Sequence, residues 1–199
     1  MVEGSKDSCF SRRRTCGRSG EIVMEIMIVV DVQRDFLLGG SLYIPDTKLL
    51  PHDIALRSSD MDLVISTRDW HPGNHMSFKN YGGIWPSHCV KGSPGADLHP
   101  LIDRISDIII SKGTDANKEA YSGFTDTSLG TLLHSKARHF DPIYIVGLAT
   151  DYCVKATALD AIKYGFSNVI VLKQLIRGVH PVGSENAFNE MRKAGIRIA

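Results

Sequence analysis

Five segments of the chain are each built around a run of Val, Ile and Leu, and a sixth, the closing GIRIA, is a weaker candidate of the same kind. Continuous apolar runs are typical of parallel strands that are covered on both faces, because neither face then carries polar side chains. The segments span residues 24–33, 62–71, 106–115, 142–151, 168–174 and 195–199. The pattern therefore predicts a mostly parallel sheet of about six strands.

Three segments between these strands have apolar residues at helical spacing. They span residues 127–137, 151–164 and 184–193, and glycines follow the last two as helix stops. Because strand–helix–strand units cross over in the right-handed sense, we expect helices on both faces of the sheet. The predicted fold class is α/β, a three-layer α/β/α sandwich.

A long segment that is rich in Gly and Pro, residues 70–101, interrupts this alternation. Loops of this length in compact domains are usually functional or disordered. Its tryptophan and histidine residues favour a functional loop. No GxGxxG or GxxxxGK[ST] motif follows any predicted strand, so the sequence gives no support for nucleotide binding of these two kinds.

The first 22 residues differ from the remainder of the chain. They are rich in Ser, Gly and Arg and have no apolar periodicity, so we predict a mobile tail, 1–22, followed by a single domain over 23–199. The tail lacks the apolar core of a secretory signal. Its Arg and Ser content leaves a transit peptide open, although Glu3 and Asp7 count against one.

The bulk composition excludes several partners. The 199 residues are 43% hydrophobic and 23% charged, with a formal net charge of +1, which gives no reason to expect nucleic acid or an anionic membrane. No apolar run approaches the roughly 18 residues of a membrane span. The four cysteines form no CxxC pair, so we expect a reducing compartment, by default the cytoplasm.

Chemistry-bearing residues follow three of the predicted strands. Asp31, Lys112 and Cys153 each lie where a strand ends, and parallel strands bring these ends to one edge of the sheet. Asp31 could take the thiol proton, Lys112 could hold the aspartate, and the helix that begins near Cys153 could stabilise an oxyanion. The alternatives are a turn aspartate, a solvated lysine and a small apolar cysteine.

Six sequence blocks, in order from about Ile26 to the C-terminus, resemble a known family. The chain is similar to nicotinamidases of the isochorismatase-like cysteine hydrolase superfamily, close to the enzymes that also hydrolyse pyrazinamide. The blocks are VVDVQRDFLLGGSL (29–42), STRDWHPGNHMSF (66–78), WPSHCVKGSPGA (85–96), SKGTD (111–115), AYSGF (120–124) and VGLATDYCVKATALDA (146–161).

The resemblance implies a set of catalytic roles. Cys153 would be the nucleophile, Asp31 the general base and then acid, and Lys112 the third catalytic residue. The backbone N–H groups of Ala149 and Cys153 would form the oxyanion hole, next to a cis peptide bond between Leu148 and Ala149. The implied reaction is hydrolysis of nicotinamide to nicotinate and ammonia through a thioester, in NAD salvage, with pyrazinamide as a further substrate.

A candidate metal site lies in the long loop and the strand before it. Asp69 and His71 project to the same side of an extended segment, His75 lies four residues further on, and His88 lies later in the loop. One carboxylate with imidazoles suits zinc, or else iron or manganese. The resemblance implies that Asp69, His71 and His88 bind one divalent metal, zinc first, which takes the pyridine nitrogen. The resemblance does not decide whether His75 is a metal ligand or a residue that supports the ligands.

The resemblance also implies a pocket for the flat ring of nicotinamide, the small-molecule partner. Phe36, Trp85 and Tyr121 match aromatic positions that line this pocket, with ordinary core packing as the alternative reading of each. Cys89 lies in the loop and not at a helix start, so we interpret it as structural. Relatives often form dimers or tetramers, but the sequence shows no self-complementary surface, so a homo-oligomer is left open.

Three other functions remain to be weighed against this one. An amidase of the same superfamily that acts on carbamoyl or ureido compounds, or an isochorismatase, would lack the Asp-x-His…His metal set. A non-catalytic relative would typically have lost one of Asp31, Lys112 and Cys153. All six residues are present in this chain.

Overall fold

The computed structural model describes residues 15–16 and 22–199. The predicted mobile tail, 1–22, therefore lies almost entirely outside the described residues. Two short strands at the start, β1 (Thr15–Cys16) and β2 (Ile22–Val23), pair with each other in antiparallel fashion.

The main sheet has six strands in the order β5-β4-β3-β6-β7-β8, and every neighbouring pair is parallel. This confirms the predicted fold class, with a sheet that is parallel throughout. The strands are β3 (Ile26–Val30), β4 (Leu63–Asp69), β5 (Ile108–Lys112), β6 (Ile143–Leu148), β7 (Val169–Arg177) and β8 (Arg197–Ile198).

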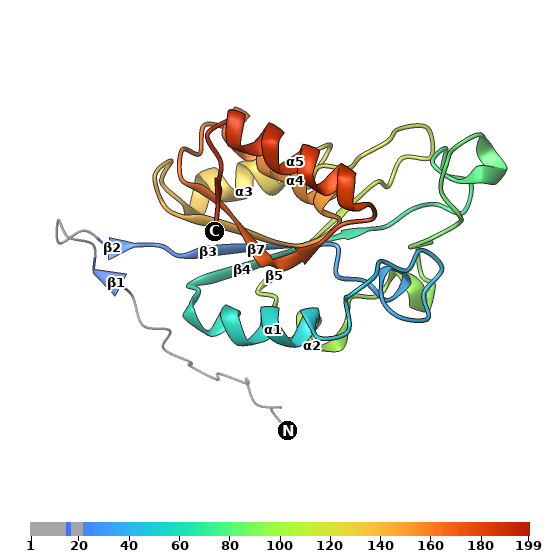
Figure 1. The fold of residues 1–199 in the computed structure, drawn as a ribbon, viewed down its shortest axis with the longest axis horizontal. Coiled ribbons are helices and arrows are strands. Elements are labelled where there is room, and N and C mark those ends of the chain that lie inside the picture. Colours follow the sequence, from blue (N-terminus) through green and yellow to red (C-terminus); the bar gives the residue numbers. More distant parts are fainter. Residues whose placement is uncertain (1–14, 17–21) are drawn as a thin grey trace, which may run out of the picture.

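Helices cover both faces of this sheet, as Figure 1 shows. Two lie on one face, α1 (Leu50–Arg57) and α2 (Pro100–Ile105), and three lie on the other, α3 (Leu129–Lys136), α4 (Lys155–Lys163) and α5 (Pro181–Lys193). The chain first moves outward from β3 to β5, then crosses to β6 and moves outward in the opposite direction. Right-handed crossovers then require helices on opposite faces for the two halves.

Two helices were not predicted from the sequence, and the three predicted helices begin at other residues than expected. Helices α1 and α2 are short, and α2 begins at the end of the long Gly- and Pro-rich segment, so neither has enough residues for a clear period. Helix α5 begins three residues earlier than predicted, with a proline in its first turn. The helix predicted from Asp151 begins as a π-helical turn, η5 (Thr150–Val154), before α4.

The core consists of two apolar layers, one on each face of the sheet. Strand β3 is completely buried, and its side chains alternate between the layers, with Ile26, Ile28 and Val30 in one and Met27 and Val29 in the other. This explains why its sequence is continuously apolar.

The long segment after β4 contains two 3₁₀ turns, η3 (Lys79–Tyr81) and η4 (Pro94–Ala96), and isolated bridges join His71 to Val90 and Phe78 to Trp85. Further 3₁₀ turns are η1 (Arg34–Phe36) and η2 (Ser58–Asp60). Among the residues that the structure describes, no helix is long and apolar enough to cross a membrane.

Candidate active site

The predicted site residues meet at the carboxyl ends of four neighbouring strands. Asp31 directly follows β3, Asp69 and Lys112 end β4 and β5 as register partners, and Cys153 lies in the turn after β6. The chain reverses its direction of travel across the sheet between β3 and β6. This switch point is where open α/β sheets leave a crevice for ligands.

The ammonium group of Lys112 is the centre of the catalytic cluster. Its Nζ donates to Asp69 Oδ1 at 2.5 Å and to the carbonyl of Ala120 at 3.1 Å, and it lies 3.0 Å from Asp31 Oδ2. The Cys153 sulfur lies 3.4 Å from the same Nζ. All of these side chains are buried. Lysine at this strand end is therefore a buried partner of two carboxylates, and the solvated-lysine alternative is wrong.

The carboxylate of Asp31 has one satisfied and one available oxygen. The Thr67 hydroxyl donates to Oδ1 at 2.7 Å, whereas Oδ2 is buried and accepts no hydrogen bond of good geometry from the described residues, although the Lys112 charge is close. An Asp31 oxygen and the Cys153 sulfur lie within 4.8 Å of each other. This carboxylate is therefore placed to exchange a proton with the thiol.

Burial and charge set the protonation states of the cluster. Burial raises the pKa of the Cys153 thiol well above its usual value, and it also raises the pKa of Asp31; in both cases Lys112 opposes the rise. Burial would lower the pKa of Lys112, but Asp31 and Asp69 raise it well above its usual value. The pKa of Asp69 is held well below its usual range, chiefly by the Lys112 ammonium, which acts against the burial of the carboxylate charge. These shifts favour a protonated sulfur beside a charged ammonium and a carboxyl with raised proton affinity.

The turn that carries Cys153 is held by backbone bonds and by one aspartate. The peptide bond between Leu148 and Ala149 is cis, as the resemblance implied. The Ala149 carbonyl accepts hydrogen bonds from the backbone N–H groups of Tyr152 and Val154. The Asp151 carboxylate accepts hydrogen bonds from the backbone N–H groups of Val179 and His180, just before α5. Asp151 therefore joins the nucleophile turn to the start of the last helix.

The predicted metal ligands lie together beside this cluster. Asp69, His71 and His88 are buried, and one ligand atom from each lies within 4.8 Å of the others. The Nδ1 atoms of His71 and His88 donate to the carbonyls of Gly113 and Pro86, at 2.9 and 2.8 Å. Because these bonds place the ring proton on Nδ1, each Nε2 keeps a lone pair for a metal. One carboxylate and two such imidazoles are a donor set that fits zinc.

A glutamine that the sequence did not single out supports this site. The side-chain amide of Gln33 accepts from the backbone N–H of Asp69 and donates to its carbonyl, both at 2.8 Å, and it also donates to the carbonyl of Ala96. A residue two positions after Asp31 thus holds the backbone of the carboxylate ligand. Nothing in its local sequence pattern distinguishes it from a surface glutamine.

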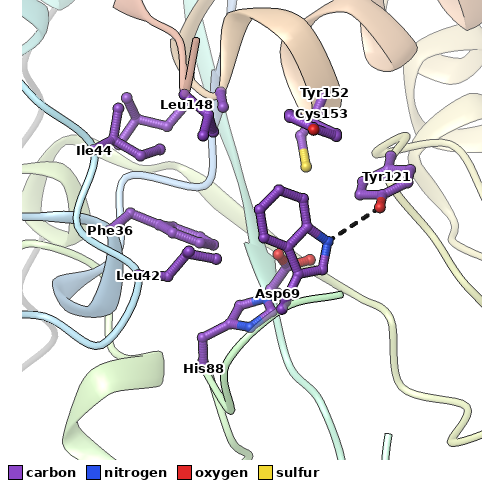
Figure 2. Close-up of a pocket in the computed structure, with 12 residues that line it drawn as sticks. Phe36, Leu42, Ile44, Asp69, His88, Tyr121, Leu148, Tyr152 and Cys153 are labelled. Atoms are coloured by element: carbon purple, nitrogen blue, oxygen red, sulfur yellow. Dashed lines mark hydrogen bonds between the residues drawn. The ribbon is translucent and has the colours of Figure 1, made fainter. Parts of the chain in front are cut away.

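The pocket above the cluster is lined mainly by apolar and aromatic side chains (Figure 2). Phe36, Trp85 and Tyr121 line it, at the positions that the resemblance implied. The indole N–H of Trp85 donates to the Tyr121 hydroxyl at 3.2 Å. The pocket encloses about 370 Å³, including the part that is open to solvent. Lining residues that sequence reasoning missed are Leu42, Ile44, Leu148, Tyr152 and Val179.

In Figure 2 the Cys153 sulfur points into this pocket. Phe36, Leu42 and Ile44 lie on one side of it and Tyr121 on the other. A flat ring between these walls would be held by apolar surfaces, with few polar groups to satisfy.

The second buried thiol of the described residues has a different environment. Cys89 has a positive φ of 45°, and its backbone N–H donates to Asp35 Oδ2 at 2.7 Å. Burial raises the pKa of the Cys89 thiol well above its usual value, and Cys89 does not line the pocket. These features support a structural interpretation of Cys89.

The chain is similar to known proteins over most of its length. Residues 25–199 match the isochorismatase domain. A nicotinamidase/pyrazinamidase of Mycobacterium tuberculosis is 39% identical over 185 residues, which cover 88% of this chain and 98% of that protein. The crystal structure of a pyrazinamidase of Pyrococcus horikoshii in complex with zinc is 43% identical, with a TM-score of 0.79, and the match covers 88% of this chain and 98% of that chain.

A second solved structure, PnC1 from L. infantum in complex with nicotinate, is 37% identical, with a TM-score of 0.83 and coverage of 89% of this chain and 92% of that chain. These matches extend over the sheet, the long loop and the nucleophile turn together. The chain therefore belongs to the isochorismatase family, in the group that contains the nicotinamidases.

Proposed function

We propose that this protein hydrolyses nicotinamide to nicotinate and ammonia through a thioester on Cys153. The observation that carries the proposal is a buried cluster beside a mainly apolar pocket. In this cluster the Cys153 sulfur lies 3.4 Å from the Lys112 ammonium and within 4.8 Å of an Asp31 oxygen. The nicotinate complex of the L. infantum relative supports the choice of substrate.

In the first half of the reaction Asp31 accepts the thiol proton while the sulfur attacks the carboxamide carbon. We assign the stabilisation of the charge that develops on the amide oxygen to the backbone N–H groups of Ala149 and Cys153, two residues that line the pocket. Asp31 then delivers its proton to the leaving nitrogen, and ammonia departs. Lys112 remains charged throughout and offsets the negative charge that the thiolate adds.

In the second half water replaces ammonia. Asp31 takes a proton from the water, whose oxygen attacks the thioester carbon. The C–S bond then breaks as the acid forms, and Asp31 returns the proton to the leaving sulfur, which restores the thiol. The Asp31 carboxylate therefore acts as base twice and as acid twice. To do so it needs a proton affinity high enough to accept the thiol proton and low enough to release it to the leaving nitrogen. The raised pKa of Asp31 is consistent with that requirement.

Asp69, His71 and His88 would hold one divalent metal, with zinc as our first choice because the Pyrococcus relative is a zinc complex. When bound there, the metal supplies a Lewis-acidic position for the pyridine nitrogen. Phe36 and Trp85 confine the ring between apolar surfaces, so that its carboxamide carbon faces the sulfur. Pyrazinamide presents the same carboxamide on a similar flat ring, so we include it as a substrate, and we assign the reaction to NAD salvage in the cytoplasm.

The test is release of ammonia from nicotinamide. We expect Cys153→Ala to abolish turnover, whereas Cys89→Ala, which removes the other buried thiol of the described chain, retains it. Mass spectrometry of a rapidly quenched reaction should find the nicotinoyl adduct on Cys153. Turnover by Cys153→Ala would refute the nucleophile assignment.

Treatment with a chelator tests whether turnover needs the metal, independently of the thiol chemistry. We expect the chelator-treated protein to lose activity and to regain it with zinc, manganese or iron. Full activity without metal would remove the metal from the proposal and leave the thioester mechanism standing.

A further inference from the structure

His75 is a completely buried histidine whose role the sequence left open. Its ring packs against that of the candidate ligand His71, tilted by 34° and with 4.1 Å between the ring centroids. Nevertheless, its nitrogen atoms are absent from the group formed by Asp69, His71 and His88. Proximity alone therefore does not make His75 a ligand.

Both ring nitrogens of His75 have protein partners. Nε2 lies 3.1 Å from the carbonyl of Lys118, which can only accept, so Nε2 carries the proton. Nδ1 then holds the lone pair, which accepts from the Ser77 hydroxyl at 2.7 Å and from the Ser77 backbone N–H at 3.3 Å. In contrast with His71 and His88, no lone pair of His75 is left over for a metal.

Ser77 and Lys118, the two partners of His75, are each connected to one residue of the hydrogen-bonded pair Trp85 and Tyr121 in the pocket wall. The carbonyl of Ser77 accepts the backbone N–H of Trp85 at 3.0 Å. Lys118 lies three residues before Tyr121, whose hydroxyl accepts from the Trp85 indole. A further hydrogen bond joins the segment before Tyr121 to the loop that follows β4: the backbone N–H of Met76 donates to the Ala116 carbonyl.

We propose that His75 is a positioning residue that does not bind the metal: it joins the loop of the metal ligands to the segment 116–121 and so sets the positions of Trp85 and Tyr121 against the substrate ring. The proposal rests on the function proposed above for its substrate. It separates ring binding, which needs His75, from metal binding and thiol chemistry, which do not.

Cobalt-loaded protein tests the metal half of the proposal, because the visible absorption of Co²⁺ depends on its ligands. We expect His75→Ala and His75→Gln to bind one Co²⁺ with the same spectrum as the wild type, whereas His71→Ala changes it. A spectrum altered in both His75 variants would make His75 a ligand and overturn the proposal. Should His75→Ala not fold, His75→Gln decides this arm alone.

Steady-state kinetics test the positioning half. Loss of a buried hydrogen bond costs roughly 1 kcal/mol, so we expect His75→Ala to raise the KM for nicotinamide by about fivefold to tenfold with little change in kcat. His75→Gln can still donate to the Lys118 carbonyl and should recover most of the affinity. His52→Ala, which removes an exposed histidine, is the matched control. An unchanged KM in His75→Ala would overturn the proposal.

A third readout does not depend on turnover. In a Trp70→Phe background the remaining tryptophan is Trp85, and we expect His75→Ala, but not His52→Ala, to shift its fluorescence and increase its quenching by acrylamide. If the wild type does not hydrolyse nicotinamide, the proposed function fails, while the cobalt spectra and this fluorescence still decide the role of His75. Identical Trp85 fluorescence in both variants would contradict the positioning role.

Discussion

A lysine without solvent contact is held in this protein by two carboxylates and a thiol. Removing a charge from water costs several kcal/mol, and the ion pairs of Lys112 with Asp31 and Asp69, at 3.0 and 2.5 Å, act against this cost. The arrangement makes the three side chains interdependent, because each carboxylate is buried as well. Substitutions at this position should therefore affect folding as well as activity.

We expect Lys112→Met to lower the free energy of unfolding by about 3–5 kcal/mol, because it leaves two buried carboxylates without their cation. Urea denaturation measures this loss. Lys163→Met is the matched control, since it removes an exposed ammonium that pairs with Asp160, and it should cost less than about 1 kcal/mol. Equal effects of the two substitutions would contradict the buried network.

Asp31→Asn keeps the acceptor for the Thr67 hydroxyl but removes the group that takes the thiol proton. We expect kcat for nicotinamide to fall by about 10² to 10⁴-fold, the usual contribution of a general base. The near-ultraviolet circular dichroism and the metal content of the variant should match those of the wild type. A kcat close to wild type would show that another group accepts the proton.

At the level of elements, β6 determines how closely the nucleophile turn approaches the base. Gly147 in β6 has a φ of +108°, and a Cβ at this position would lie 2.1 Å from the carbonyl oxygen of Val30 in β3. Val30 directly precedes Asp31, so the close packing of these two strand ends brings the acid and the thiol together. Glycine is required here by both the backbone conformation and the available space.

Gly147→Ala should accordingly cost roughly 3 kcal/mol of stability, from the strained φ and the contact with Val30 combined. The substitution should also reduce kcat, because the added methyl group would push apart the ends of β3 and β6, after which Asp31 and Cys153 lie. The control is Gly73→Ala, where an added Cβ meets nothing within 4 Å and φ is not positive. Thermal unfolding and kinetics of both variants measure the difference, and a stable, fully active Gly147→Ala would contradict this account.

For the whole molecule, metal binding and folding should be linked. The ligands come from β4 and from the loop that follows it, and they are assembled only in the folded chain. Free metal at a hundredfold excess over its Kd adds about 2.7 kcal/mol to stability. For a chain of this size this corresponds to a rise in Tm of roughly 5–10 °C.

Calorimetry with zinc and with a chelator measures this rise. We expect it to disappear in His71→Ala, and to be absent when magnesium replaces zinc, because magnesium prefers oxygen ligands. A Tm that does not respond to zinc in the wild type would contradict a metal site at Asp69, His71 and His88.

Much of the fold could be predicted because its determinants are local. A continuous apolar run identifies a strand covered on both faces, and the alternation of such runs with helical segments predicts the three layers. Helices α1 and α2 were missed because six to eight residues carry little periodicity. The candidate site depended on the rule that parallel strands bring their ends to one edge, together with the family resemblance, which singled out Asp69, His71 and His88.

Local sequence patterns were sufficient to predict the class of fold and the kinds of side chain at the strand ends, because burial and backbone preference act over a few residues. The tertiary structure alone decided which atoms face each other. It paired both nitrogens of His75 and left Nε2 of His71 and His88 available, it used Gln33 to hold Asp69, and it added Leu42, Ile44 and Tyr152 to the pocket. These relations depend on hydrogen-bond geometry between segments that lie far apart in the chain, and no local pattern encodes it.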